Sequence, residues 1–176
     1  MKKLMGLLTI TFLLTGCISI PTGDGGKIKL SKDGVEIKDK DGEKSSISVD
    51  AEEGGYSMEF EDGTSTSAGS HATIPDAFPK DILLPKDGQL LQSGESEYEG
   101  RPAYMLTYQV QGDMTKDAEL YHAYLTDNNY EINEVLLADA MIVYQGRKTP
   151  HYLGYQLMGD AGDPDYMISV SYGELE

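Results

Sequence analysis

The stretch RPAYMLTYQVQGDMTKDAELYHAYLTDNNY, residues 101–130, contains the change of hydrophobic period that decides the fold. In its first part apolar residues alternate with polar ones, as in a strand that packs one face on a core. In its second part they recur three and four residues apart, as on one face of a helix. The strand face comprises Tyr104, Leu106, Tyr108 and Val110, and the helix face comprises Ala118, Tyr121 and Leu125.

The ends of this helix can be read from its flanks. Asp113 or Thr115 can cap its start, and Asn128 with Asn129 suits its C-terminal end. Before the strand, residues 89–100 alternate in the same way, and the Glu99–Gly100 pair predicts a hairpin turn. The sequence therefore predicts two paired strands followed by one helix.

Four more alternating stretches follow the helix, at 130–139, 140–147, 151–159 and 166–174. With them, residues 89–176 are expected to fold as an α+β domain. It would contain an antiparallel sheet with one main helix, as ββα followed by about four strands.

A small β-meander is predicted ahead of this domain, over residues 27–62. Four short alternating stretches are separated by glycine-bearing turns, which favour tight hairpins. Because it has few large apolar side chains, the meander is expected to pack on the second domain or on a partner. Its apolar side would carry Ile28, Leu30, Val35, Ile37, Ile47, Val49, Tyr56, Met58 and Phe60.

Residues 63–88 change composition and predict a linker that ends in a docking segment. The first part is rich in Ser, Thr and Gly, and the second carries prolines among large apolar residues, which excludes a helix or a central strand. We expect this second part to dock on the following domain; a proline-rich recognition motif is the alternative. The docking side chains would be Ile74, Phe78, Ile82 and Leu84.

The N-terminus has the three parts of an export signal. Lys2 and Lys3 precede an apolar run that is too short to span a bilayer, and small residues lead to the only cysteine, Cys17. The stretch Leu14-Thr15-Gly16-Cys17 resembles the lipobox of bacterial lipoproteins. That resemblance implies a signal peptide over residues 1–16 and a diacylglyceryl group on the Cys17 thiol. An ordinary secretory signal with a chance cysteine is the alternative reading.

Two lipid chains would hold the protein stably at a membrane. The expected location is the outer face of the bacterial cell membrane, or the outer membrane if the envelope has one. Residues 17–26 would form a short tether behind the lipid. With no second cysteine in the chain, no intramolecular disulfide can form, so stability must come from packing.

The charge limits the range of partners. Without residues 1–16 the chain keeps 12 basic and 30 acidic residues. This excess of acid argues against nucleic acid, and against a body lying flat on anionic lipid. It serves solubility, or it attracts a cationic partner or a weakly bound divalent cation.

No catalytic motif stands out, and no cofactor is expected. His71, His122 and His151 lack zinc-type spacing, and no serine-nucleophile or phosphate-loop pattern occurs. The stretch from Asp39 fails the EF-hand pattern. The strongest metal candidate is weak: three carboxylates on one turn could hold calcium, or could simply make the turn. These are Asp160, Asp163 and Asp165.

Tyrosines on the predicted strands could form an exposed face that binds a protein, a peptide or a glycan of the envelope. Alternatively, the rings pack the core and its rim. The four rings singled out are Tyr104, Tyr108, Tyr155 and Tyr172. The expected function is a non-catalytic binding or interaction module. The alternatives are an envelope enzyme or enzyme inhibitor whose site forms only in the fold, and a spacer between the lipid and a partner.

Overall fold

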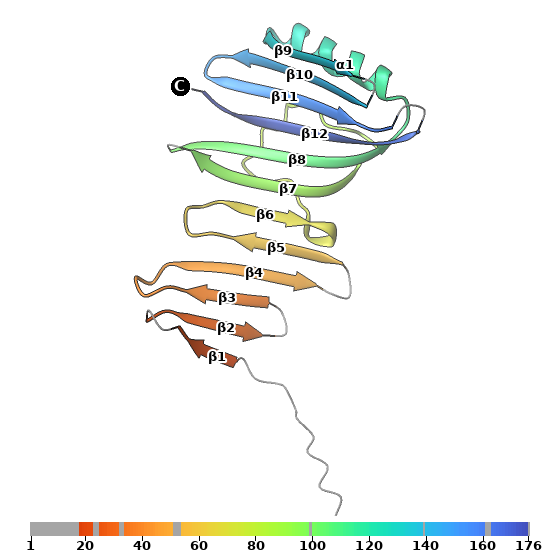
Figure 1. Ribbon diagram of the computed structural model, residues 1–176. Coiled ribbons are helices and arrows are strands. Elements are labelled where there is room, and N and C mark those ends of the chain that lie inside the picture. Colours follow the sequence, from red (N-terminus) through yellow and green to blue (C-terminus); the bar gives the residue numbers. More distant parts are fainter. Residues whose placement is uncertain are drawn as a thin grey trace, which may run out of the picture.

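The computed structural model describes residues 18–22, 25–31, 34–50, 54–98, 100–138, 140–160 and 163–175. Their strands form one antiparallel sheet in the order β1-β2-β3-β4-β5-β6-β7-β8-β12-β11-β10-β9 (Figure 1). The predicted α+β class, an antiparallel sheet with one helix, is confirmed. The signal peptide, the lipobox residues Leu14, Thr15 and Gly16, and Cys17 itself lie outside the described residues.

The strands have the following bounds: β1 Ile18–Pro21, β2 Lys27–Ser31, β3 Gly34–Lys38, β4 Lys44–Asp50, β5 Gly55–Glu59, β6 Ser65–Ala68, β7 Gln89–Tyr98, β8 Arg101–Gln111, β9 Glu131–Ala138, β10 Met141–Lys148, β11 His151–Met158 and β12 Asp165–Glu174. The α-helix, α1, spans Met114–Asp127, and a 3₁₀ turn, η1, spans Gly69–His71.

The arrangement differs from the prediction in strand number and in continuity. The expected tether contains β1, and the expected linker contains β6, so the N-terminal part has more strands than its alternation indicates. β6 pairs with β5 on one side and with β7 on the other, and thereby joins the predicted meander and the C-terminal strands into a single sheet. Polar residues can form such a strand because its neighbours on both sides supply the hydrogen bonds.

The helix begins where its cap predicts. The Asp113 side chain accepts hydrogen bonds from the backbone N–H groups of Thr115 and Lys116, at 3.1 and 3.3 Å. The predicted apolar face of the helix is buried against the last three strands of the sheet order. The buried core comprises Phe78, Ile82, Tyr104, Leu106, Tyr108, Val110, Ala118, Tyr121, Leu125, Leu153, Tyr155, Leu157, Tyr166, Ile168, Val170 and Tyr172.

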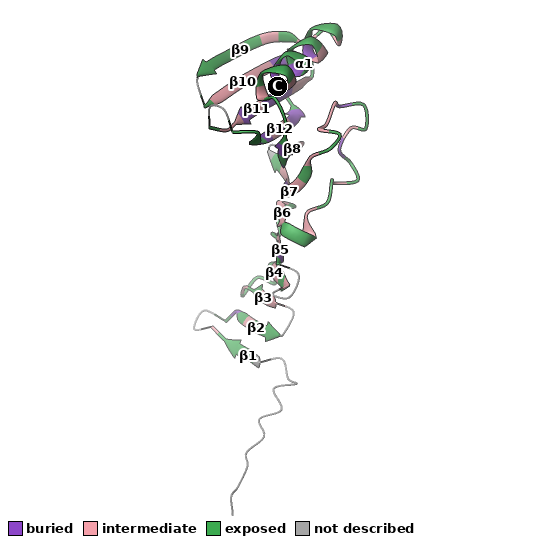
Figure 2. Ribbon diagram, turned by 90° about the vertical axis from the view of Figure 1, so that its right-hand side faces the viewer, coloured by how far each residue is buried: buried purple, intermediate pink, exposed green. Residues whose placement is uncertain are grey.

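The proline-bearing segment docks on the same face of the sheet as the helix. Phe78 meets the ring of Tyr104 edge-on, with centroids 5.7 Å apart. The hydroxyl of Tyr155 donates to the carbonyl oxygen of Leu83 at 3.0 Å. The Tyr124 hydroxyl, from the helix, donates to the Asp81 carbonyl at 2.7 Å. Helix and segment together cover one face of the C-terminal strands, and Figure 2 shows the buried residues gathered there.

The N-terminal strands are a single layer. Figure 2 shows β1 to β6 without an α-helix or a second sheet against either face; among the described residues, only the short turn η1 lies beside β5. Cross-strand pairing places Ile47, Met58, Thr66, Gly94 and Met105 in one row that runs from β4 to β8. Met105 lies on the opposite side of β8 from the buried residues of that strand. The apolar side of the N-terminal strands therefore continues into the uncovered face of the C-terminal ones.

Candidate interaction face

The face of the sheet that carries neither the helix nor the docking segment is named the helix-free face. It extends over both halves of the sheet. Its N-terminal part is an apolar strip, and its C-terminal part is a mixed surface of Met, Gln, Ser and Thr. In the C-terminal part Thr107 and Ser169 join adjacent strands through their hydroxyls, 3.2 Å apart.

The apolar strip contains eight of the nine residues predicted for the apolar side of the meander, and the strand register confirms that these eight share one face. The ninth, Phe60, follows the end of β5 and is outside the strand register, and Ile20 of β1 joins the strip. Nothing covers it among the residues described, and Val49 is 50% exposed. Contiguous exposed apolar surface on a soluble domain commonly marks an interaction site. The strip is formed by Ile20, Ile28, Leu30, Val35, Ile37, Ile47, Val49, Tyr56 and Met58.

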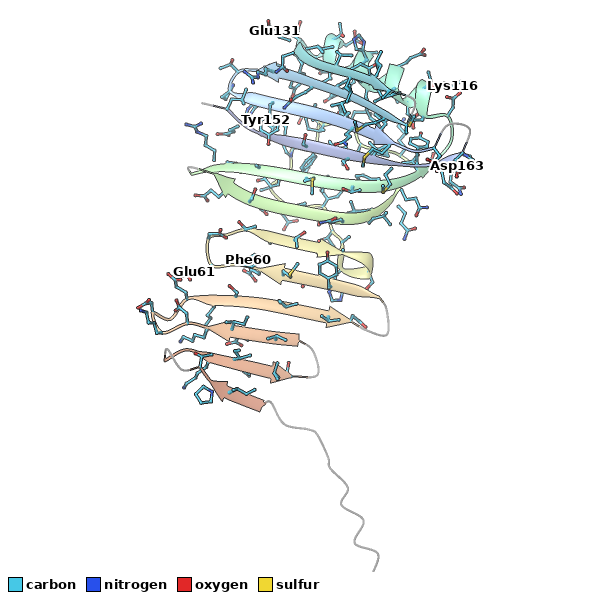
Figure 3. The ribbon with its side chains drawn as sticks, in the orientation of Figure 1. Phe60, Glu61, Lys116, Glu131, Tyr152 and Asp163 are labelled. Atoms are coloured by element: carbon cyan, nitrogen blue, oxygen red, sulfur yellow. The ribbon has the colours of Figure 1, made fainter. Side chains whose placement is uncertain are left out.

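A pocket of about 520 Å³ lies at one end of the C-terminal part of the helix-free face. Its apolar lining includes Leu91, the extra residue of a bulge in β7, and two methionines of β11 and β12. Figure 3 shows Asp163 in the turn that links these two strands, at the strand ends. The lining residues are Leu91, Gln109, Ala140, Met158, Gly159, Asp160, Asp163, Asp165, Tyr166 and Met167.

The structure brings Asp160, Asp163 and Asp165 to the rim of this pocket. Within the turn, Asp163 Oδ1 accepts a hydrogen bond from the Asp165 backbone N–H at 2.9 Å, and the Asp163 N–H donates to the Asp160 carbonyl at 3.0 Å. These bonds are those of a turn-making aspartate. In the part of the chain that the structure covers, no three His, Cys, Asp or Glu residues are grouped to hold a metal ion.

The tyrosine face is a correction to the sequence analysis. Tyr104, Tyr108, Tyr155 and Tyr172 share one side of the sheet, but all four are buried, so they do not form an exposed binding face. The reason is that the helix and the docking segment cover that side. Burial raises the pKa of all four hydroxyls above their ordinary value. The exposed face is the opposite one, and it is not tyrosine-rich.

The three histidines lie in three separate places. His71 Nε2 is 4.0 Å from an Asp50 carboxylate oxygen, beside β5. The His122 ring is 5.0 Å from that of Tyr144 between centroids, and the His151 ring stacks on Tyr172 at 5.3 Å. The fold therefore does not bring the histidines together, and none of them lines the pocket on the helix-free face.

A row of methionines on the helix-free face was not predicted from the sequence. Met141 of β10 pairs with Met158 of β11, and Met158 pairs with Met167 of β12. Gln156, on the same face of β11, directs its side-chain amide at the first two sulfurs. The only signal in the sequence was that each of three predicted strands contains a methionine. The strand register was needed to show that the three are aligned.

Comparison with protein-family models, with curated proteins and with solved structures found no match. Among the described residues, no helix combines the length and the apolar character needed to cross a bilayer.

Proposed function

We propose that this protein is a lipid-anchored binding module on the outer face of a bacterial membrane. In this proposal Cys17 carries the diacylglyceryl anchor, and the helix-free face binds a protein, peptide or glycan of the envelope. The observation that supports it best is the continuity of that face. One uncovered surface runs from β1, which starts one residue after Cys17, to the pocket beside β12.

The N-terminal strands are suited to hold the C-terminal part away from a surface. Neighbouring strands are spaced about 4.8 Å apart, so the six steps from β1 to β7 span roughly 30 Å. Figure 1 shows these strands stacked in sequence order. The spacer role considered in the sequence analysis is therefore compatible with the binding role, since the same strands do both.

The distribution of charge supports an orientation in which β1 is near the membrane and the C-terminal strands are away from it. Residues 18–44, which include β1 to β3, contain six lysines and six acidic residues, so they are electrically neutral. The excess of acid lies wholly in residues 45–176. Anionic lipid headgroups repel acidic surfaces within about 10 Å, which is the Debye length at 0.1 M salt. A neutral end near the membrane and an acidic end away from it avoid this repulsion.

The anchor is tested by comparing the wild-type chain with Cys17→Ala in the producing cell. We expect the wild-type protein to take up radiolabelled palmitate and to sediment with membranes, and Cys17→Ala to do neither. Recovery of unlabelled wild-type protein in the soluble fraction would overturn the proposal of an anchor.

The binding face is tested separately with a photo-crosslinking amino acid. It is placed at Met167, which is 39% exposed on the helix-free face, or at Leu120, which is 51% exposed on the helix. We expect an envelope partner to crosslink from position 167 and not from the control position 120. Equal yields from both positions would contradict a partner site on the helix-free face.

A further inference from the structure

Three methionines form a contiguous row on the helix-free face. Met141, Met158 and Met167 occupy directly opposed positions on three neighbouring strands. Opposed residues on one face of an antiparallel sheet have Cβ atoms about 5 Å apart. The three side chains therefore start from neighbouring positions on one face, and methionine is long and flexible enough for their sulfurs to meet above the central strand.

Two of the sulfurs converge on a single point. The amide nitrogen of Gln156 lies 3.3 Å from the sulfur of Met141 and 3.2 Å from the sulfur of Met158. Both sulfurs thus direct lone pairs at the same small donor. A thioether is a weak acceptor of hydrogen bonds, so a ligand that bonds sulfur strongly can displace the amide.

The pocket gives access to this row. Met158 and Met167 line it, and its rim carries Asp160, Asp163 and Asp165. The rim carboxylates make the local potential negative, and the net charge of the chain, −16, adds to it. These charges attract a small cation to the mouth of the pocket.

We propose that Met141, Met158 and Met167 form a thioether site for a soft monovalent metal ion of the Cu(I) and Ag(I) class. Thioether sulfur is polarizable and uncharged, so it selects soft cations over hard ones such as calcium or magnesium. In this site the carboxylates attract cations of any kind, and the sulfurs select the soft ones among them. This site requires neither the lipid anchor nor an envelope partner.

Silver is the probe for the test, because Ag(I) is stable in air. The whole chain is used in detergent with Cys17→Ser, so that its thiol cannot bind the metal. We expect about one silver ion per chain by equilibrium dialysis, and no competition from calcium or zinc. With methionine ε-methyl groups labelled by ¹³C, the three row signals should shift together as that first ion binds.

Matched variants distinguish silver binding by the three methionines of the row from silver binding by other methionines of the chain. Met167→Leu changes an exposed position and keeps the side-chain volume, so the fold should be retained. We expect it to weaken silver binding at least about tenfold. The control triple variant, Met58→Leu with Met105→Leu and Met114→Leu, should bind as the parent does. Equal binding by parent and Met167→Leu, or a first ion that shifts only methionines outside the row, would overturn the proposal.

Discussion

Tyr121 of α1 stacks on Tyr155 of β11, with ring centroids 4.3 Å apart and an interplanar angle of 19°. Both rings are fully buried. Tyr155 also donates its hydroxyl to the carbonyl oxygen of Leu83 in the docking segment. One side chain therefore connects the three elements that enclose the core.

Tyr155→Phe should destabilise the fold, since it keeps the stacked ring but leaves the Leu83 carbonyl without its donor. We expect a loss of about 1 kcal/mol in the free energy of unfolding, measured with urea. The matched change is Tyr108→Phe, because the buried Tyr108 hydroxyl has no hydrogen-bond partner among the residues described. This second variant should be as stable as the parent or more stable. The opposite ranking of the two variants would contradict the assigned hydrogen bond.

Alkaline pH should unfold the protein. Burial raises the pKa of Tyr130 to about 12, and it raises the pKa of Tyr121 and Tyr155 as well. In the unfolded chain these hydroxyls ionise near pH 10, while in the folded chain they stay protonated. The unfolded state therefore binds fewer protons above pH 10, and stability falls as pH rises from 10 towards 12.

The measurement is the urea midpoint between pH 8 and pH 11.5, with tyrosinate absorbance followed in parallel. We expect a constant midpoint up to about pH 9.5 and a steady decrease above it. Ionisation of all the tyrosines near pH 10 with no loss of structure would contradict the burial of their hydroxyls.

Gly69→Ala should loosen the junction between the N-terminal and C-terminal strands. Gly69 has φ of +62°, and a Cβ there would collide with the backbone oxygen of Gly54. Gly63 has φ of +82° but open space around it, so Gly63→Ala is the matched control. We expect the control to cost about 1 kcal/mol from its backbone conformation alone, and Gly69→Ala to cost clearly more. Hydrogen exchange of β5 and β6 amides should be accelerated only in Gly69→Ala; equal effects would refute the predicted steric clash.

The apolar strip should bind a hydrophobic dye in the isolated protein. Ile37→Thr combined with Val49→Thr removes two exposed apolar side chains from it and keeps β-branched residues in the strands. We expect stability to change by no more than about 0.5 kcal/mol per site, and the fluorescence of bound ANS to fall. Ser46→Thr, on the opposite face, should leave the fluorescence unchanged. Undiminished fluorescence in the double variant would show that the dye binds elsewhere.

Local periodicity predicted the elements better than it predicted their surroundings. The helix cap at Asp113, one of the two predicted candidates, and the buried triad of Ala118, Tyr121 and Leu125 depend on spacing within one segment, and the structure confirms them. The exposure of Tyr104 and Tyr172 depends on what packs over them. That layer comes from a docking segment in which Phe78 and Ile82 are buried as predicted, whereas Ile74 is exposed. The position of the segment over the tyrosine face was not predicted.

Strand pairing was harder to predict than strand existence. Ser65–Ala68 has no large apolar residue, so only its neighbours make it a strand. The methionine row likewise depends on register between strands that turns connect, and the bulge at Leu91 shifts the register of β7 against β8. The pattern of residues within one strand does not indicate its register against the neighbouring strand.

Because β1 to β8 pair in sequence order, the chain responds to mechanical force one strand at a time. A pull applied at residue 18, across the strands, acts on the hydrogen bonds of one strand pair at a time rather than on all of them together. Strands would peel off singly from the outermost inward, each adding slack, while the helix-covered core stayed intact. Under such a pull the N-terminal strands would lengthen the chain before the helix-covered part of the sheet opens.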